Sequence, residues 1–178
     1  MEMTGLDCNQ HVILEVAVVI TNSNLDVLET SDSYAIYQPD DELNKMDKWN
    51  INTHSKSGLI DRVKQSEYSI NHVESKILEL VHKYTKKHSS PLCGNTIYQD
   101  RKFIIKYMPK LEEYLHYRNI DVSSIKELAK RWYPDIYKGF KKHNKHEALA
   151  DIIESINELK YYRDNIFKIQ ENSTSLII

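Results

Sequence analysis

The sequence predicts a single α/β domain in which a mixed sheet is flanked by helices. Three observations predict this class: short β-branched segments dominate the first 40 residues, helical periodicity dominates the remainder, and brief apolar segments separate the later helices. Strands that alternate with helices in this way are typical of an α/β fold. The length of 178 residues fits one domain, and only 4 glycines and 4 prolines leave little room for linkers.

The N-terminal part predicts an antiparallel meander. Residues 12–20 (VILEVAVVI) form a nearly continuous β-branched run that only Glu15 breaks, which indicates a buried strand. A polar turn over residues 21–24 follows, and residues 25–29 and 34–38 have the composition of two further strands.

The rest of the chain predicts helices separated by two short strands. Pro109 is expected to interrupt one helix, and Ser123 can cap the next. The last helix carries a stripe of Ile152, Ile156, Leu159, Tyr162 and Ile166. The helices are predicted over residues 40–54, 70–87, 100–117, 124–132 and 147–167. The strands are predicted at 91–94 and 120–122, a basic loop at 138–145 and a frayed tail at 170–178.

Charge and cysteine content exclude several classes of protein. A net charge of −2 argues against a protein that coats long duplex nucleic acid by bulk attraction. Residues 126–146, however, contain seven lysines and arginines but only two acidic residues. This stretch is either a basic lip for a small anionic ligand or a solvated helix face. Two cysteines, no membrane-length apolar run and no secretion signal predict a cytoplasmic protein without a membrane partner.

A scattered acidic set carries the candidate chemistry. Glu2 lies at the chain start, Asp100 lies in apolar surroundings, and Asp151 and His146 lie at the start of the last helix. Carboxylates gathered in a cleft require cations, and hard oxygen ligands suit Mg²⁺ or Mn²⁺. Each residue also has a surface alternative. His146 and Asp151 are five positions apart, about 140° around a helix, so spacing alone makes a weak case for that pair.

Several long motifs carry a resemblance to a known family. The stretches are EMTGLD (2–7), MDKWNINTHSKSGL (46–59), PLCGNTIYQDRKF (91–103), YMPKLEEYLHYRNIDVSSIKELAKRW (107–132) and HEALADIIESINELKYYR (146–163). They resemble the oligoribonuclease family of the DEDDh 3′-5′ exonuclease superfamily, in register from residue 2 to about residue 168. The resemblance implies a ribonuclease H-like exonuclease domain over residues 1–168 and a C-terminal tail over 169–178. It also implies a homodimer that degrades short RNA of two to five nucleotides to mononucleotides.

The resemblance assigns catalytic roles position by position. Glu2 matches the second acid of the family's Asp-x-Glu motif, Asp100 the third acidic metal ligand and Asp151 the fourth. His146 matches the general base, since a histidine titrating near neutrality can take a proton from the attacking water. The implied cofactor is a pair of divalent ions, Mg²⁺ or Mn²⁺, which activate water and stabilise the leaving oxygen.

The resemblance also assigns substrate contacts. Leu6 and Trp49 match an apolar wedge and stacking surface, which is largely indifferent to base identity. His54 and Asn95 match residues near the substrate backbone. A cluster that the neighbouring subunit brings to the far end of the substrate, and that would select for length, comprises Tyr117, Arg118, Ser123 and Ser124. From the sequence alone, Trp49 and Tyr117 also fit core packing.

One departure from the family pattern concerns the N-terminus. The motif begins with an aspartate, and this chain starts at the following position, as Met1, without the strand that precedes it. Either Met1 is an internal methionine of a longer, active protein, which is the favoured explanation, or the product is shortened and inactive. The 178-residue chain by itself is therefore expected to be poorly active. Two rival functions remain: a DEDDh exonuclease for DNA or longer RNA, and an inactive module that only binds dinucleotides.

Overall fold

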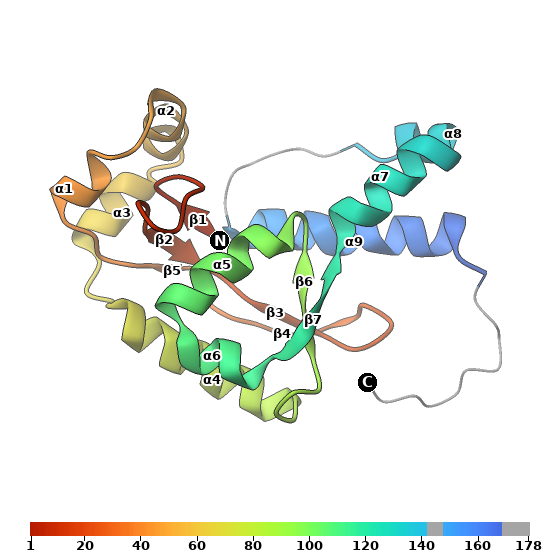
Figure 1. Ribbon diagram of the computed structural model, residues 1–178, viewed down its shortest axis with the longest axis horizontal. Helices are drawn as coiled ribbons and strands as arrows, with labels where there is room; N and C mark the ends of the chain where they lie inside the picture. The colour runs from red at the N-terminus through yellow and green to blue at the C-terminus, as the bar shows by residue number, and fades with distance from the viewer. Residues whose placement is uncertain (142–147, 169–178) are drawn as a thin grey trace.

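The computed structural model describes residues 1–141 and 148–168, and it has the mixed α/β architecture that the sequence predicts (Figure 1). The strands are β1 (Glu2–Met3), β2 (Ile13–Val16), β3 (Val19–Thr21), β4 (Val27–Thr30), β5 (Tyr34–Ala35), β6 (Pro91–Gly94) and β7 (His116–Asp121). The helices are α1 (Asp40–Leu43), α2 (Lys48–Lys56), α3 (Leu59–Gln65), α4 (Ile70–Tyr84), α5 (Ile97–Tyr107), α6 (Pro109–Tyr114), α7 (Val122–Trp132), α8 (Pro134–Gly139) and α9 (Ala148–Ile166).

The strands pair in both senses. β2 lies between β1 and β5 and is antiparallel to each, with Glu2 directly opposite Glu15. β3 and β4 form an antiparallel hairpin. β6 and β7 are parallel, and α5 and α6 make the crossover that a parallel pair requires. This combination of pairings is the mixed sheet structure expected of a ribonuclease H-like domain.

The single strand predicted over residues 12–20 is divided into β2 and β3. Ser31 explains the break, because it takes both backbone groups of Val18. The Ser31 hydroxyl accepts from the Val18 N–H at 2.9 Å, and the Ser31 N–H donates to the Val18 carbonyl at 2.8 Å. The chain therefore changes pairing partner at this point, and β3 continues beside β4 instead of β5.

The predicted helix over residues 100–117 is wrong at both ends. It begins earlier, with α5, and Pro109 starts a separate helix, α6, at the position where a missing N–H costs nothing. Residues 116 and 117 belong to β7, which is longer than the predicted strand over 120–122. The cap of α7 is Asp121 and not Ser123, since the Asp121 carboxylate accepts from the Ser123 N–H at 2.9 Å.

The short helices α3 and α8 were not predicted, and the predicted helix over residues 40–54 is divided into α1 and α2. Residues 44–47 separate α1 from α2, and Asp47 caps α2 by accepting from the Asn50 N–H at 2.8 Å. Gly58 lies between α2 and α3 with φ of 69°, a left-handed conformation that favours glycine. The predicted basic loop over 138–145 begins inside α8, and its residues 142–145, like the tail over 170–178, lie outside the described residues.

The core lies on both sides of β2. On one side, residues of β2 and β5 pack against apolar side chains of α4, α5 and α6, including Ile77 and Phe103. On the other side, Leu14 packs against α1 and α3 through Leu43 and Leu59. Because β2 is buried on both sides, all four of its residues are inaccessible, and the charged Glu15 is among them. The strand that pairs with β1 is thus firmly fixed.

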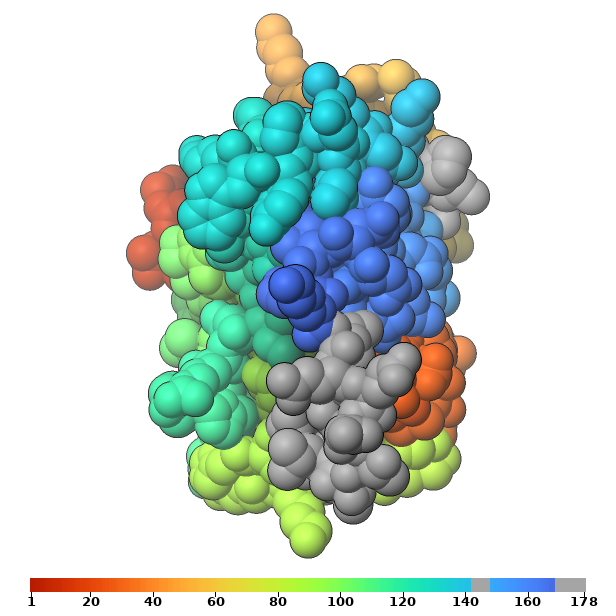
Figure 2. Space-filling model, turned by 90° about the vertical axis from the view of Figure 1, so that its right-hand side faces the viewer, coloured from red at the N-terminus to blue at the C-terminus, as the bar shows by residue number. Residues whose placement is uncertain are grey.

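The last helix packs through a polar seam. Of the predicted apolar stripe only Tyr162 is buried, and Ser155 and Glu158 are buried beside it. Lys126 of α7 pairs with Glu158 at 3.2 Å. Figure 2 shows α7 and α8 lying against α9 on one face of the molecule, and the Tyr161 hydroxyl donates to the Ile136 carbonyl at 2.8 Å there. Within the described ranges, no helix has the length and apolar content needed to cross a membrane.

Candidate active site

Glu2 is the centre of the candidate site. Its position on β1, opposite Glu15, places both side chains on the same face of the sheet. The pKa of Glu2 is raised to about 7, mainly by burial; the N-terminal ammonium lowers it, and the nearby charges of Asp151, Glu15 and Asp100 add to the rise. The structure therefore places Asp151 of α9 and Asp100 of α5 within electrostatic range of Glu2 on β1.

A tight turn between β6 and α5 positions Asp100. Thr96 has a left-handed backbone with φ of 54°, and its N–H donates to Asp121 at 3.0 Å and to the Ser123 hydroxyl at 2.9 Å. Asp100 follows in the first turn of α5. Burial raises the pKa of Asp100, while the N-terminal ammonium, 3.6 Å from one carboxylate oxygen, opposes this rise.

Asp151 lies in the first turn of α9, three residues after Ala148. The Ala148 N–H donates to Glu15 on β2 at 3.3 Å, so the start of this helix is held against the sheet that carries Glu2. His146, the predicted general base, lies outside the described residues.

His54 of α2 is part of the site but is buried behind Glu2. The side chain is only 1% exposed. Its Nε2 lies 3.2 Å from the Met3 carbonyl oxygen and its Nδ1 lies 3.9 Å from a Glu2 carboxylate oxygen. His54 therefore links α2 to β1, and its predicted contact with the substrate backbone stays a prediction.

The predicted stacking residues lie at the surface. Leu6 is 69% exposed, Trp49 is 58% exposed and Tyr117 is 73% exposed, which excludes core packing for Trp49 and Tyr117 within this chain. The Tyr117 ring stacks on His116 with 4.5 Å between centroids, and the Arg118 guanidinium lies 5.4 Å from the Tyr117 centroid. All three side chains thus lie at positions that a ligand or another subunit can reach.

The predicted far-end cluster lies on two successive elements of the chain. Tyr117 and Arg118 lie near the start of β7, whereas Ser123 and Ser124 lie beyond its end in α7 (Figure 1). The four steps of extended chain from Tyr117 to Asp121 span about 13 Å. The predicted contacts of this cluster with substrate stay predictions.

Asn95 takes part in an internal network. Its amide group donates to Ser155 at 2.8 Å and to Glu158 at 3.1 Å, and its carbonyl oxygen accepts from the Ser123 hydroxyl at 3.1 Å. This network joins β6, α7 and α9. The predicted contacts of Asn95 and Ser123 with substrate stay predictions.

Sequence reasoning missed Arg101, which follows Asp100 directly. Its guanidinium is buried and donates to Glu112 at 2.8 Å, to the Asn119 side chain at 2.7 Å and to the Arg118 carbonyl at 3.3 Å. Asp100 and Arg101 thus connect one helix to the acidic site and to β7. An arginine within the otherwise buried face of α5 was the available signal.

The donor chemistry of Glu2, Asp100 and Asp151 fits a hard divalent cation. All three offer carboxylate oxygens, which Mg²⁺ and Mn²⁺ prefer. The raised pKa of Glu2 reflects its burial first and the neighbouring acidic groups second, and nearby cations favour the charged form of such a carboxylate. Among residues 1–141 and 148–168, however, no three acidic, histidine or cysteine side chains converge closely enough to hold an ion as they stand.

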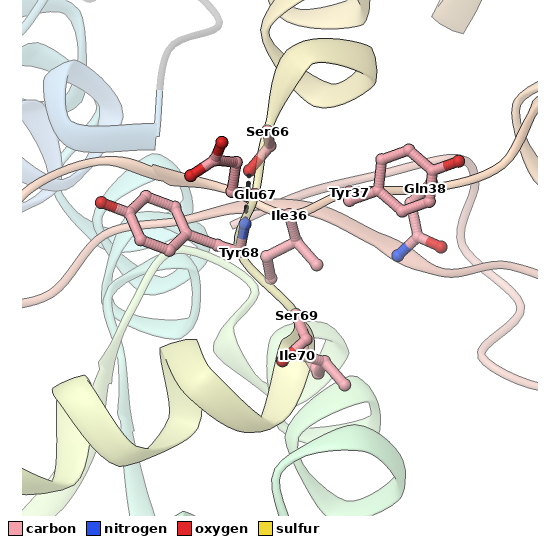
Figure 3. Close-up of a pocket in the computed structure, with 8 residues that line it drawn as sticks. All are labelled: Ile36, Tyr37, Gln38, Ser66, Glu67, Tyr68, Ser69 and Ile70. Atoms are coloured by element: carbon pink, nitrogen blue, oxygen red, sulfur yellow. Dashed lines mark hydrogen bonds between the residues drawn. The ribbon is translucent and has the colours of Figure 1, made fainter.

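Two hollows on the described surface are lined by residues other than the predicted acidic ligands. One of about 420 Å³ lies between β5 and the segment that joins α3 to α4, where the rings of Tyr37 and Tyr68 point to opposite sides (Figure 3). It contains no predicted site residue. Another, of about 490 Å³, lies beside Leu6 and Lys102. The hollow beside Leu6 is the one that adjoins a predicted stacking residue.

The described part of the basic stretch is largely ion-paired, and this favours the solvated-face interpretation over a basic lip. Arg131 pairs with Glu127, and Lys138 lies 3.9 Å from Asp135. Lys126 is already committed to buried Glu158.

The sequence of this chain matches a known family. Residues 1–159 match the RNase T family model, described as Exonuclease, and the chain belongs to this exonuclease family. Within it, the chain is similar to oligoribonucleases. It is 54% identical to that of Chromobacterium violaceum, 56% identical to that of Nitrosomonas europaea and 53% identical to that of Bordetella pertussis, each alignment covering 95% of this chain and 93% of the relative.

Proposed function

We propose that this protein is a divalent-metal-dependent 3′-to-5′ exoribonuclease that degrades RNA of two to five nucleotides to mononucleotides. The observation that carries the proposal is that Asp100 on α5 and Asp151 on α9 lie within electrostatic range of Glu2 on β1. The relatives named oligoribonuclease support the substrate class, and membership of the exonuclease family supports the reaction type.

Glu2, Asp100 and Asp151 are proposed to hold two ions of Mg²⁺ or Mn²⁺. Such ions lower the pKa of a bound water and neutralise charge on the phosphate. His146 takes the proton from the attacking water, because an imidazole titrates near neutral pH. His54 holds the Glu2 carboxylate from behind, as its distances to Glu2 and Met3 support.

Substrate binding is proposed to use stacking more than charge. Leu6 and Trp49 are exposed and offer faces to the bases. Tyr117 and Arg118 are proposed to close the far end of the substrate in a neighbouring subunit and so to select for short RNA. A homodimer is supported by the exposed apolar side chains of β7 and α7, which include Ile120, Leu128 and Trp132.

We further propose that the exonuclease domain spans residues 1–168, that residues 169–178 are a tail and that the protein acts in the cytoplasm. The family match over residues 1–159 supports the first boundary. Limited proteolysis followed by mass spectrometry tests it: protection that ends near residue 168 supports the division, and equal protection through residue 178 contradicts it.

A length series of labelled oligoribonucleotides tests the substrate class. The chain, with and without the N-terminal strand and aspartate that the resemblance predicts, is incubated with Mn²⁺ and RNA from dimers to 20-mers. Faster release of mononucleotides from dimers than from 20-mers is expected. Equal rates across the series would favour a nuclease for longer substrates, and tight dimer binding without release would favour an inactive binding module.

Two substitutions test the assignment of roles. His146→Ala is expected to abolish turnover while Mn²⁺ and dinucleotide still bind, because the base is not a ligand. Asp151→Ala is expected to weaken Mn²⁺ binding itself. Isothermal titration with Mn²⁺ and a mononucleotide-release assay separate the two effects, and normal turnover in both variants would contradict the site.

A further inference from the structure

Glu15 is a buried charged residue with both carboxylate oxygens engaged. It is 2% exposed and lies at the centre of β2, the strand that is covered on both sides. One oxygen accepts from Arg62 at 2.8 Å, and the other accepts from the Ala148 N–H at 3.3 Å. A buried carboxylate is costly unless it is paired and hydrogen-bonded, so these two partners define its environment.

We propose that Glu15 is a positioning residue, which fixes the first turn of α9 and thereby places Asp151 against Glu2. The proposal rests on the proposed function of the acidic site. Although Glu15 lies opposite Glu2, we do not assign it as a metal ligand, because its two oxygens accept from Arg62 and Ala148. It acts through the helix that follows.

The effect on Asp151 follows from helix geometry. The first N–H groups of a helix have no partner within the helix, and a carboxylate that accepts from one of them restrains the first turn. The negative charge also suits the positive end of the helix dipole. Asp151 is three residues after Ala148, within the same turn. A metal-binding carboxylate tolerates displacement of only about 0.5 Å, so loosening this turn displaces the ligand.

Arg62 extends the same restraint to α2. While one guanidinium nitrogen pairs with Glu15, the other donates to the Ser57 carbonyl at 2.9 Å, at the end of α2. His54, which contacts Glu2 and Met3, lies three residues before Ser57. A single carboxylate on β2 thus connects the helix that carries His54 with the helix that carries Asp151.

Glu74 offers a matched control. It is also 2% exposed, lies on α4 and accepts from the N–H groups of Lys110 and Leu111 at 2.7 and 3.1 Å, at the start of α6. Its carboxylate therefore does for α6 what that of Glu15 does for α9. Since α6 carries none of the predicted site residues, Glu74→Gln tests the effect of replacing a buried glutamate charge outside the site.

Hydrogen exchange tests the restraint without relying on activity. In the 178-residue chain, Glu15→Gln is expected to speed exchange of the backbone amides at the start of α9 by about tenfold, because one amide oxygen cannot serve both partners well. Arg62→Met, which changes a half-exposed side chain, is expected to act in the same direction to a smaller extent. Glu74→Gln is expected to leave exchange at the start of α9 unchanged, because one amide oxygen can still accept from both N–H groups that Oε1 serves. Unchanged exchange at α9 in both Glu15→Gln and Arg62→Met would overturn the proposal.

Kinetics test the positioning role. With the N-terminally extended chain, dinucleotide and Mn²⁺, Glu15→Gln is expected to lower kcat by about 10- to 100-fold and to raise the Mn²⁺ concentration needed for half-maximal rate, with little change in KM for the dinucleotide. Glu74→Gln is expected to keep both at temperatures where it is folded. Equal losses in the two variants would overturn the positioning role. If the unsubstituted protein releases no mononucleotide, the proposed function is wrong. The hydrogen-exchange experiment does not depend on activity and still tests whether Glu15 restrains the start of α9.

Discussion

The raised pKa of Glu2 predicts that the metal-free protein loses stability as the pH rises. Glu2 titrates at about 7 in the folded protein, against 4.5 for an ordinary glutamate, mainly because it is buried. The folded state therefore binds the proton more tightly than the unfolded state. The stabilisation is complete below about pH 4.5 and is lost progressively as the pH rises through about 7.

The magnitude follows from the size of this shift. A shift from 4.5 to about 7 corresponds to about 3 kcal/mol over the whole range. Between about pH 5.5 and 8, the part accessible to a folded protein, the loss is about 2 kcal/mol. The Glu2 side chain is 16% exposed, so solvent screening reduces this value only modestly.

Glu2→Gln isolates the effect. Glutamine is close in size to glutamate and does not ionise, so the substitution removes this titration. The pH dependence contributed by the other groups, including Asp100 with its raised pKa, is common to both proteins and cancels when their stabilities are compared. Urea unfolding in EDTA is expected to show the variant gaining about 2 kcal/mol on the unsubstituted protein between about pH 5.5 and 8. Added Mn²⁺ at about pH 8 is expected to stabilise the unsubstituted protein more.

A stability difference between the two proteins that is the same at both pH values would refute the reasoning, since it would mean that Glu2 titrates alike in the folded and unfolded chains. Equal stabilisation of both proteins by Mn²⁺ would separately refute the ligand role of Glu2.

Three further substitutions are predicted from the structure. Gly58→Ala is expected to lower the free energy of unfolding by about 1 kcal/mol in urea titrations, because φ of 69° is strained for alanine; no loss would contradict the left-handed turn. Trp49→Ala is expected to weaken dinucleotide binding about tenfold in fluorescence titrations yet change stability by less than about 0.5 kcal/mol, since the ring is exposed; a large stability loss would indicate packing instead. Lys126→Met is expected to cost about 2 kcal/mol in thermal unfolding, because Glu158 loses a cation while it remains buried; unchanged stability would show that the rest of the network suffices.

The α/β class and the strand over residues 91–94 were predictable from the sequence, since composition and periodicity determine them locally. The division of the long N-terminal strand was not, because it depends on the hydroxyl of Ser31, which is distant in sequence from Val18. The apolar stripe predicted for the last helix was incomplete for a similar reason: its residues are buried or partly buried, but Glu158 is buried with them. Lys126 and Asn95 make it possible to bury Glu158, and neither partner is evident from the periodicity of α9.

The candidate site also contains residues that the sequence predicted and a residue that only the fold reveals. The family motifs predicted Glu2, Asp100 and Asp151, and the folded chain places Asp100 and Asp151 within electrostatic range of Glu2. No motif pointed to Glu15 as a partner of α9, although a single charge within a β-branched run was visible. Its partners lie 47 and 133 residues away, and only the folded chain shows them.

The adjacency of Asp100 and Arg101 has a mechanical consequence. Successive residues of a helix point in different directions. α5 therefore contacts the acidic centre through Asp100 and the backbone of β7 through Arg101. Because Arg101 donates to the Arg118 carbonyl, the backbone beside Tyr117 is fixed directly to the helix that carries Asp100.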